Sequence, residues 1–432
     1  MPNPYVRAAE AIAPARLGRS FRWLLASSVI SNVGDGVALA AGPLLVASQT
    51  RDPLLVSLAV LCQTLPVLLF GFLAGAVADR VDRRKIVALV NLGRALVLGI
   101  LAATIAADAI SIAVILAALF VLGTAETFAD VGAGSLLPRL VRREDLGIAN
   151  ARLSGAFLLA NHLVAPPIGA FLFAAGMALP FVTDAVCFAL GALLITRIAY
   201  REDTAAQAGI GPATAPSSLR ADIAAGLRWL AHNPPMRTLA LTIIAFNVTY
   251  GAAWSVLVLY AGERLGMSAV GFGLITSAMA VGGIIGTVSY GRLERRFALA
   301  DIMRVGLLIE TVTHLVLALT TAAGVALATF VVFGAHAFVW GTTATAVRQR
   351  AVPDALLGRV TGVYRVGVML GIVVGTPIGG WLARQYGITA PFWFGFVGSA
   401  ILVVVMWRQF DKIVHAGDHV PHAPAAGPAS ST

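Results

Sequence analysis

The sequence predicts an all-α polytopic membrane protein with twelve transmembrane helices in two pseudo-symmetric halves of six. Three observations carry this prediction. Hydrophobic residues make up 58% of the 432 residues and charged residues only 12%, whereas soluble domains carry roughly 25% charged residues. The apolar residues form runs of about twenty residues without the alternation of a barrel strand. Matching residues recur at one nearly constant offset, which indicates a duplicated body.

The apolar runs predict helices because hydrocarbon excludes backbone groups that are not hydrogen-bonded within the segment. Cys62 and Cys187 lie inside such runs and are interpreted as buried small residues rather than as a disulfide or a metal site. The first run is too long for a signal peptide and is interpreted as the first helix. The predicted spans are residues 22–48, 54–78, 86–107, 110–132, 153–174, 178–198, 238–260, 267–290, 300–320, 323–346, 361–383 and 389–408.

Basic residues gather in alternate loops, and the opposite loops hold only Arg51, Arg264 and Arg384. By the positive-inside rule, the basic loops and both termini face the cytoplasm. The net charge of +10 comes from the basic residues of these loops. Nucleic acid is therefore not expected as a partner. Lys85 and Lys412 are the only lysines beside many arginines, which is typical of a GC-rich bacterial genome and fits a bacterial inner membrane.

The predicted halves are residues 1–200 and 238–410, with a cytoplasmic linker at 201–237 and a disordered tail at 411–432. Residues 204–217 of the linker are rich in Ala, Gly, Pro and Ser. From Leu219 to Leu230, apolar residues follow helical spacing, which predicts an amphipathic helix that either lies on the membrane or is solvated.

An offset of about 211 residues relates the two halves. It pairs Gly75 with Gly286 and Val141 with Val352, and further pairs include Pro180-Phe181 with Pro391-Phe392. Six helices return the chain to its starting side, so the two copies run in the same direction across the membrane.

A charged loop at residues 79–85 separates the second and third spans, and six of its seven residues are charged. With Gly75 it has the form Gly-x-x-x-Asp-Arg-x-x-Arg-Arg, which resembles the loop between helices 2 and 3 in the major facilitator superfamily of secondary transporters. The resemblance implies a conformational latch in which Asp79 acts against the second half. Asp82 stands where the family usually has Gly, and Tyr290 replaces Asp79 in the second copy. The expected latch residues are Gly75, Asp79, Arg80, Arg83, Arg84, Arg94 and Asp130.

The fifth span carries Ala165-Pro166-Pro167-Ile168-Gly169-Ala170, which resembles the Gly-Pro-x-x-Gly-Gly signature of proton antiporters, although Ala replaces both outer glycines. Its counterpart is Gly375-Thr376-Pro377-Ile378-Gly379-Gly380 in the eleventh span. Close packing of small residues explains the pattern as often as antiport does. Other segments, such as Ser31 to Gly36, look like the enterobactin-exporter and macrolide-efflux type of bacterial permease. This resemblance covers nearly the whole chain and favours export.

Ionisable residues inside the spans are functional candidates, because each costs at least about 2.5 kcal/mol near the bilayer centre when unpaired. Asp35 lies near mid-depth of the first span and is the predicted proton-coupling carboxylate. The alternative for Asp35 is a structural hydrogen bond to Asn32 or to a neighbouring helix. Glu126 is a second coupling candidate. A charge pair of Arg94 with Glu126 or Asp130 is expected between adjacent helices.

Glu310 and His314 are four residues apart in the ninth span. They are either a proton relay or a mutually satisfied polar pair, and both are proton-coupling candidates. His162 is interpreted as a packed, hydrogen-bonded histidine, and Asp184 as an interfacial acid.

In the resembled family, helices 1, 4, 7 and 10 line a central cavity. Tyr250 and Trp254 are four residues apart, as are His336 and Trp340, so each pair shares one face of its helix. An aromatic, weakly polar lining suits amphiphilic or planar solutes, while ordinary interhelical packing is the alternative. The substrate-cavity candidates are Asn32, Asp35, Glu126, Asn247, Tyr250, Trp254, His336 and Trp340.

No phosphate loop and no His or Cys cluster with metal-ligand spacing stands in the sequence, so neither a cofactor, an ATP-driven pump nor an enzyme is expected. The prediction is a monomeric secondary transporter whose partners are the lipid bilayer, a small-molecule substrate and protons. Its expected cargo is hydrophobic or amphiphilic, drug-like or siderophore-like, exported in exchange for protons. An importer or facilitator of a small metabolite is one alternative, and a receptor without transport is another.

Overall fold

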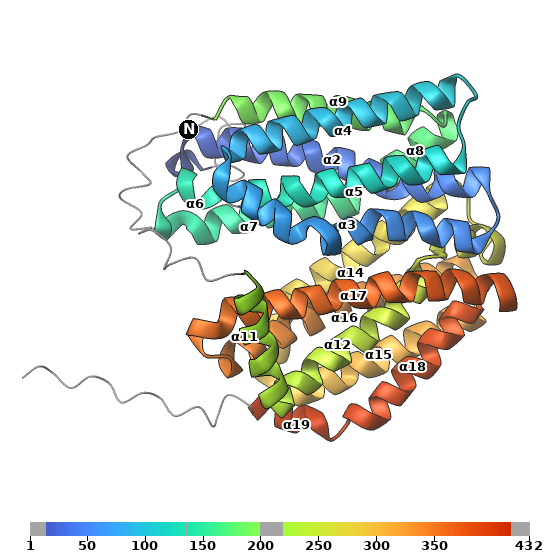
Figure 1. Cartoon of the computed structure of the whole chain (residues 1–432). Helices are drawn as coiled ribbons and strands as arrows, with labels where there is room; N and C mark the ends of the chain where they lie inside the picture. Colours follow the sequence, from blue (N-terminus) through green and yellow to red (C-terminus); the bar gives the residue numbers. More distant parts are fainter. Residues whose placement is uncertain (1–13, 135, 199–218, 416–432) are drawn as a thin grey trace, which may run out of the picture.

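The chain folds into a bundle of long helices in two halves. The computed structural model describes residues 14–134, 136–198 and 219–415, and this part of the chain contains helices but no strand. Figure 1 shows the first half above the second. The first half contains η1 (Ala15–Leu17), α2 (Gly18–Gln49), α3 (Pro53–Arg80), α4 (Arg83–Ala106), α5 (Ile112–Gly134), α6 (Leu137–Leu140), η2 (Arg143–Asp145), α7 (Leu146–Phe157), the π-helical η3 (Leu158–Val164), α8 (Ala165–Ala175) and α9 (Leu179–Thr196).

The second half follows the same plan after an additional helix. It contains α11 (Leu219–His232), α12 (Pro234–Trp254), α13 (Leu257–Leu259), the π-helical η4 (Tyr260–Arg264), α14 (Ala269–Arg296), α15 (Leu299–Leu319), α16 (Ala323–Ala351), α17 (Asp354–Tyr386), α18 (Ala390–Met406) and α19 (Gln409–Val414).

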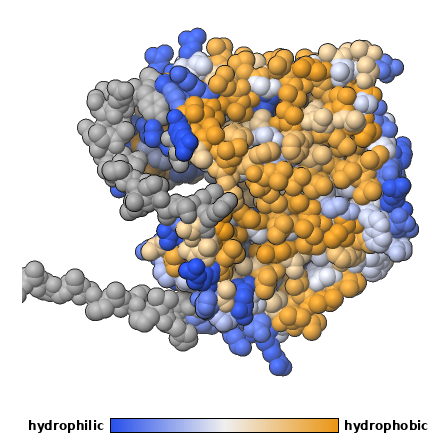
Figure 2. All heavy atoms as spheres, in the orientation of Figure 1, coloured by the Kyte–Doolittle hydropathy of each residue, from blue (hydrophilic) through white to orange (hydrophobic). Residues whose placement is uncertain are grey.

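Within the described ranges, ten helical segments are long and apolar enough to cross a membrane. The bent pair of α12 with α13 and η4 supplies an eleventh, and the 17-residue apolar helix α18 completes the predicted twelve. Large hydrophobic side chains on these helices are exposed, as contact with lipid requires. Figure 2 shows a broad hydrophobic surface across the middle of the molecule, with hydrophilic residues toward its two ends. The prediction of an all-α polytopic membrane protein is confirmed.

The seventh predicted span differs from the straight helix expected over 238–260. It begins at Pro234, where Asn233 accepts a hydrogen bond from the backbone of Met236. After Trp254 the chain bends by 44° into α13 and η4. The hydroxyl of Tyr260 donates to the carbonyl of Leu317 at 2.6 Å and fixes the bent piece to α15.

Both ends of the second half also differ in detail from the prediction. The tail was expected to be disordered from residue 411, but residues 411–414 belong to α19, because Phe410 and Ile413 are buried against the second half. The linker residues 204–217 lie outside the described residues, whereas α11 packs on α17. There Asp222 pairs with Arg359 at 2.6 Å, and Gly226 lies close to the Arg359 carbonyl.

We call the end that holds the α3–α4 loop, α11 and α19 the basic end, and the end that holds the α2–α3 turn the opposite end (Figure 1). The two halves meet at the opposite end. Arg51 lies 3.5 Å from Glu263, and Arg384 lies 3.6 Å from Asp52, so each pair joins one half to the other. Arg264 donates to the last carbonyls of α15. The three arginines of the opposite loops therefore all have structural partners.

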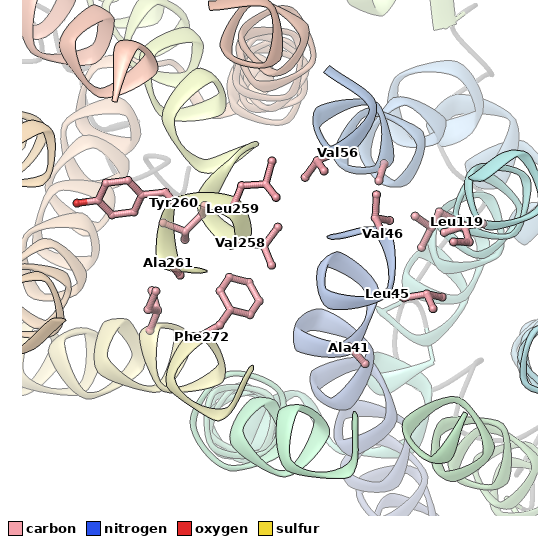
Figure 3. Packing of buried hydrophobic residues seen from close by; sticks show 14 of the residues in the cluster. Ala41, Leu45, Val46, Val56, Leu119, Val258, Leu259, Tyr260, Ala261 and Phe272 are labelled. Carbon is pink, nitrogen blue, oxygen red and sulfur yellow. The ribbon is translucent and has the colours of Figure 1, made fainter. Parts of the chain in front are cut away.

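An apolar core reinforces this contact between the halves. Figure 3 shows Val258, Leu259 and Phe272 of the second half facing Val46 and Val56 of the first, and all five belong to one buried cluster. Further contacts bring backbones together: a Cβ at Gly380 would overlap the side chain of Ser57, and Ser277 donates to the carbonyl of Leu163 at 2.7 Å. The opposite end is therefore closed in this conformation.

The basic end is open by comparison. Figure 2 shows the molecule hollowed between the two halves on this side. In α3, a Cβ added at Gly71 or Gly75 would meet no atom within 4 Å, and the same holds for Gly358 and Gly362 in α17. The structure therefore represents a conformation that opens toward the basic end.

The repeat-related glycines Gly75 and Gly286 have different surroundings. A Cβ at Gly286 would overlap the backbone of Ala335, whereas a Cβ at Gly75 would meet open space. We expect Gly286→Ala to destabilise the second half by about 1–3 kcal/mol through overpacking. Gly75→Ala is the matched control and should unfold like the wild type. Thermal unfolding of the two purified variants in detergent measures the difference, and equal unfolding temperatures would contradict the packing at Gly286.

Candidate functional site

The first half contains a buried ion pair. Arg94 of α4 donates from Nη2 to Oδ1 of Asp35 in α2. The Arg94 side chain is 7% exposed and that of Asp35 is 21% exposed, so the carboxylate is partly accessible while the guanidinium is almost enclosed. Phe188 of α9 lies under the guanidinium, with 3.8 Å between the Arg94 Cζ atom and the ring centroid. The pair therefore fixes three helices around one cation.

A second carboxylate faces the same arginine. Asp184 of α9 is 1% exposed, and its Oδ1 has no hydrogen-bond partner among the described residues. This oxygen packs against Gly34, where a Cβ would collide with it. Asp184 interacts electrostatically with both Asp35 and Arg94. The interpretation of Asp184 as an interfacial acid is wrong, because neighbouring helices enclose it completely.

Two acids of α5 extend this cluster toward the space between the halves. Glu126 and Asp130 are exposed, yet both interact electrostatically with Asp35 and Arg94. Asp130 also interacts with Arg365 of α17 in the second half. The expected direct pair of Arg94 with Glu126 or Asp130 is replaced by the pair with Asp35. The acids thus form a series of decreasing exposure that ends at buried Asp184.

The charge of the buried part does not balance. Asp35 is paired with Arg94 and Asp184 is a second, buried acid near it, so two ionised carboxylates beside one guanidinium would leave a net charge of −1 (two negative, one positive) in the interior. An unpaired buried charge is costly, and the group takes up a proton instead. The cluster can therefore hold a proton. Of the structural alternatives for Asp35, the hydrogen bond from Asn32 is not formed, because Asn32 donates to the carbonyl of Ser28. The hydrogen bond to a neighbouring helix is formed, with Arg94 of α4 as the donor.

The second half contains a different buried cluster. Glu310 of α15 is fully buried, with His314 Nδ1 at 3.4 Å and Nε2 of His336 in α16 at 3.5 Å. Both Glu310 oxygens lack a hydrogen-bond partner in the part of the chain described. Gly395 of α18 provides the space for His314, since a Cβ there would overlap the ring. The expected pair of Glu310 with His314 is thus a triad, and two spans contribute to it.

Aromatic residues separate this triad from the space between the halves. Tyr250 and Trp254 of α12 are partly exposed and stack with ring centroids 4.5 Å apart. The rings of Trp254 and His314 also lie edge to face, with their centroids 6.0 Å apart. Asn247 is buried and its Cβ lies close to Gly371 of α17, so it packs between helices rather than lining a cavity.

His336 and Trp340 do not point where the sequence suggested. Both are buried and line a groove between α14, α15 and α16, on the outer side of the second half. Gly306 of α15 allows both rings to approach closely, because a Cβ at this position would overlap them. The central position expected for this pair is therefore corrected.

The charged loop at the basic end is held by its own side chains. Asp82 caps α4 by accepting from the backbone of Arg84 at 2.9 Å, and the Arg84 side chain hydrogen-bonds to it at 3.0 Å. These hydrogen bonds from Arg84 lower the pKa of Asp82, although its partial burial acts against them. Arg84 also donates to the Ile198 carbonyl. Asp82 therefore keeps Arg84 in the first half, while the side chain of Asp79 lies outside what the structure describes.

The antiporter-like motif lies at contacts between helices. In α8, a Cβ at Gly169 would overlap the backbone of Val37 in α2. In α17, Gly375 and Gly379 meet the backbone of α12 in the same way, and Gly380 meets α3. Pro166 and Pro167 lie in the first turn of α8, directly after the π-helical η3, where a missing backbone N–H is tolerated. Packing thus accounts for these residues in this conformation.

The comparisons with known proteins agree with this architecture. The family model described as "Transmembrane secretion effector" matches residues 9–429. The multidrug efflux pump Tap of Mycolicibacterium fortuitum is 28% identical over 85% of this chain and 90% of its own length. The enterobactin exporter EntS of Shigella boydii is 25% identical over 92% of this chain and 96% of its own length. A bacterial homologue of the iron transporter ferroportin, solved in an inward-facing state, superposes with a TM-score of 0.68 at 21% identity, covering 92% of this chain and 98% of that one.

These matches, together with the twelve-span bundle and its two halves, show a membrane transporter rather than an enzyme. The chain belongs to the transmembrane secretion effector family of major facilitator transporters.

Proposed function

We propose that this chain exports hydrophobic or amphiphilic small molecules, drug-like or siderophore-like, in exchange for protons. The observation that carries the proposal is the buried ion pair of Arg94 with Asp35, which has a second buried carboxylate, Asp184, within its electrostatic range. The functions of the two relatives, multidrug efflux and enterobactin export, support export over uptake. The basic end is proposed to face the cytoplasm of a bacterial inner membrane, together with both termini, and the chain to act as a monomer.

The proposed coupling is an exchange of partners at Arg94. In the present conformation Arg94 is bound to Asp35, and Oδ1 of Asp184 has no hydrogen-bond partner among the described residues. When a proton neutralises Asp35, the guanidinium loses its partner in α2 and Asp184 of α9 becomes the remaining carboxylate within its field. The change weakens the bond between α2 and α4 and so alters how these helices pack. Glu126 and Asp130 are proposed to pass protons between the open side and Asp35.

The substrate is proposed to bind between the halves, against the aromatic surface of Tyr250 and Trp254. Stacked aromatic rings bind planar or amphiphilic solutes without demanding one hydrogen-bond pattern. Alternating access then requires the opposite end to open and the basic end to close. Gly75 and the loop residues Arg80, Arg83 and Arg84 are proposed to act when the basic end closes, because α3 is unobstructed there in the present conformation.

Asp35→Asn removes the titrating carboxylate and keeps its size. We expect this variant to retain binding of an amphiphilic fluorescent dye but to lose dye movement driven by a proton gradient, by at least about tenfold. The measurement is dye flux in proteoliposomes with a pH indicator inside. Thr183→Val, which removes the hydroxyl of a partly exposed residue on the neighbouring helix α9, is the control and should transport normally. Proton flux coupled to dye in Asp35→Asn, at the wild-type rate, would refute the assignment.

Arg94→Met removes the cation from between its two carboxylates. Loss of one partner from a buried pair costs about 3–5 kcal/mol, so we expect a strongly destabilised protein. The double variant Arg94→Met/Asp35→Asn should regain much of that stability, because one buried negative charge has also been removed. It should not regain transport, because the coupling carboxylate is absent. Thermal unfolding in detergent measures the recovery. If the double variant were no more stable than Arg94→Met, the two residues would not be coupled as the structure indicates.

The direction of transport separates the proposal from a facilitator or importer of the same fold. For an exporter, we expect dye to move out of the compartment that the basic end faces when the other compartment is made acidic. Reversing the gradient should reverse the movement, and a facilitator should respond to the dye gradient alone. Absence of flux under every gradient would instead favour a receptor without transport.

A further inference from the structure

The interior of the second half holds a carboxylate that the proposed coupling at Arg94 does not use. Glu310 of α15 is fully buried, and neither of its oxygens has a hydrogen-bond partner among the described residues. An ionised carboxylate in such a place is costly unless a positive charge accompanies it. The net charge of this region therefore depends on the groups that surround Glu310.

Within the described residues, the titratable groups that face Glu310 are two imidazoles and one phenol. His314 comes from the same helix, His336 from α16 and Tyr250 from α12. Helix α18 packs on α15 and leaves room for His314 at Gly395, and it contains no ionisable residue. A positive charge beside Glu310 therefore has to come from a protonated histidine.

His314 has a nitrogen that is free to take up this proton. Its Nδ1 lies 3.0 Å from the backbone carbonyl of Glu310, and because a carbonyl only accepts, Nδ1 carries a hydrogen. In the neutral ring Nε2 is then the basic nitrogen, and it has no hydrogen-bond partner in the described part of the chain. A proton on Nε2 makes His314 an imidazolium whose Nδ1 lies 3.4 Å from Glu310 Oε1. The cluster is then electrically neutral.

The ring that covers His314 lies at a bend of the chain. Trp254 is the last residue of α12, and its ring lies edge to face with that of His314. Directly after Trp254 the chain bends by 44° into the piece whose Val258 and Leu259 face the first half (Figure 3). Opening of the opposite end has to separate this piece from the first half. The same movement therefore acts on the residue that covers His314.

We propose that Glu310, His314 and His336 bind a second proton that is exchanged in every transport cycle, so that each half binds one proton. The inference rests on the proposed export in exchange for protons and adds its stoichiometry. With the opposite end open, His314 Nε2 takes up a proton from that side. With the basic end open, the proton leaves past the aromatic layer of Tyr250 and Trp254, on which the substrate is proposed to stack.

The test is the ethidium gradient that the full chain sustains in proteoliposomes at zero net flux, with the membrane potential held at zero by valinomycin and equal potassium. Ethidium is planar and keeps its charge over the pH range used. If two protons exchange for one dye molecule, a difference of one pH unit sustains an ethidium gradient of about a hundredfold. This gradient does not depend on how much of the protein is active, so partial unfolding cannot imitate a change in stoichiometry.

Glu310→Gln keeps the size of the side chain and removes the charge that retains the second proton. We expect this variant to transport ethidium and to sustain a gradient of only about tenfold per pH unit, which corresponds to one proton. Thr329→Val is the matched control, because it removes the hydroxyl of a partly exposed residue on α16 that bonds to its own helix, and it should sustain the wild-type gradient.

Two results would overturn the inference and leave the proposed function in place. One is a wild-type gradient of the one-proton size, which needs no variant to be observed. The other is the two-proton gradient in Glu310→Gln, since the second proton would then bind elsewhere. The proposed function fails in a different way, through a wild-type protein that moves no ethidium or whose ethidium gradient ignores the pH difference, and the inference then fails with it.

Discussion

The polar interior of the first half depends on one guanidinium. Arg94 is planar, keeps its charge at any physiological pH and offers several donors, so it can serve Asp35 and still lie within reach of a second acid. A lysine would provide one point charge and could be neutralised by burial. Helices α2, α4 and α9 therefore meet around a cation that cannot be lost by deprotonation, while the acids around it can each gain or lose a proton. Within this cluster, only the carboxylates can thus change their charge by binding or releasing a proton.

Much of the fold follows from the sequence, because hydrocarbon allows so few solutions. The twelve predicted apolar runs correspond to twelve spans in the structure, and their boundaries differ by up to seven residues, at Leu146 and at Asp354. The bend after Trp254 was missed, since the hydrogen bond from Tyr260 to Leu317 that fixes the second piece joins residues 57 positions apart. The short helix α19 was also missed, because only packing on the second half explains why Phe410 and Ile413 are buried. The composition of a short segment does not predict such long-range contacts.

The site was less accessible from the sequence, since a residue's depth and partner are set by helix rotation. Asp35 and Glu310 stood out as acids in apolar runs, but the partner of Asp35 proved to be Arg94, and His336 joined Glu310 from another span. The repeat in the sequence contains one indication of where the two buried clusters lie. At the offset of 211, Asp184 corresponds to Gly395, and each lies at the buried cluster of its own half: one as a carboxylate, the other as the space for His314. The duplicated scaffold was kept while its polar chemistry diverged.

The ion pairs that join the halves at the opposite end have a consequence for the rate of the cycle. Arg51 is 80% exposed and Arg384 is 53% exposed, so water and salt screen both pairs and each contributes little to stability. Weak contacts of this kind suit a joint that has to part in every turnover, because a deeply buried pair would hold the protein in one state. The ionic part of the joint is therefore easy to break, and the ionic strength outside the bilayer acts on this part and not on the apolar core beside it.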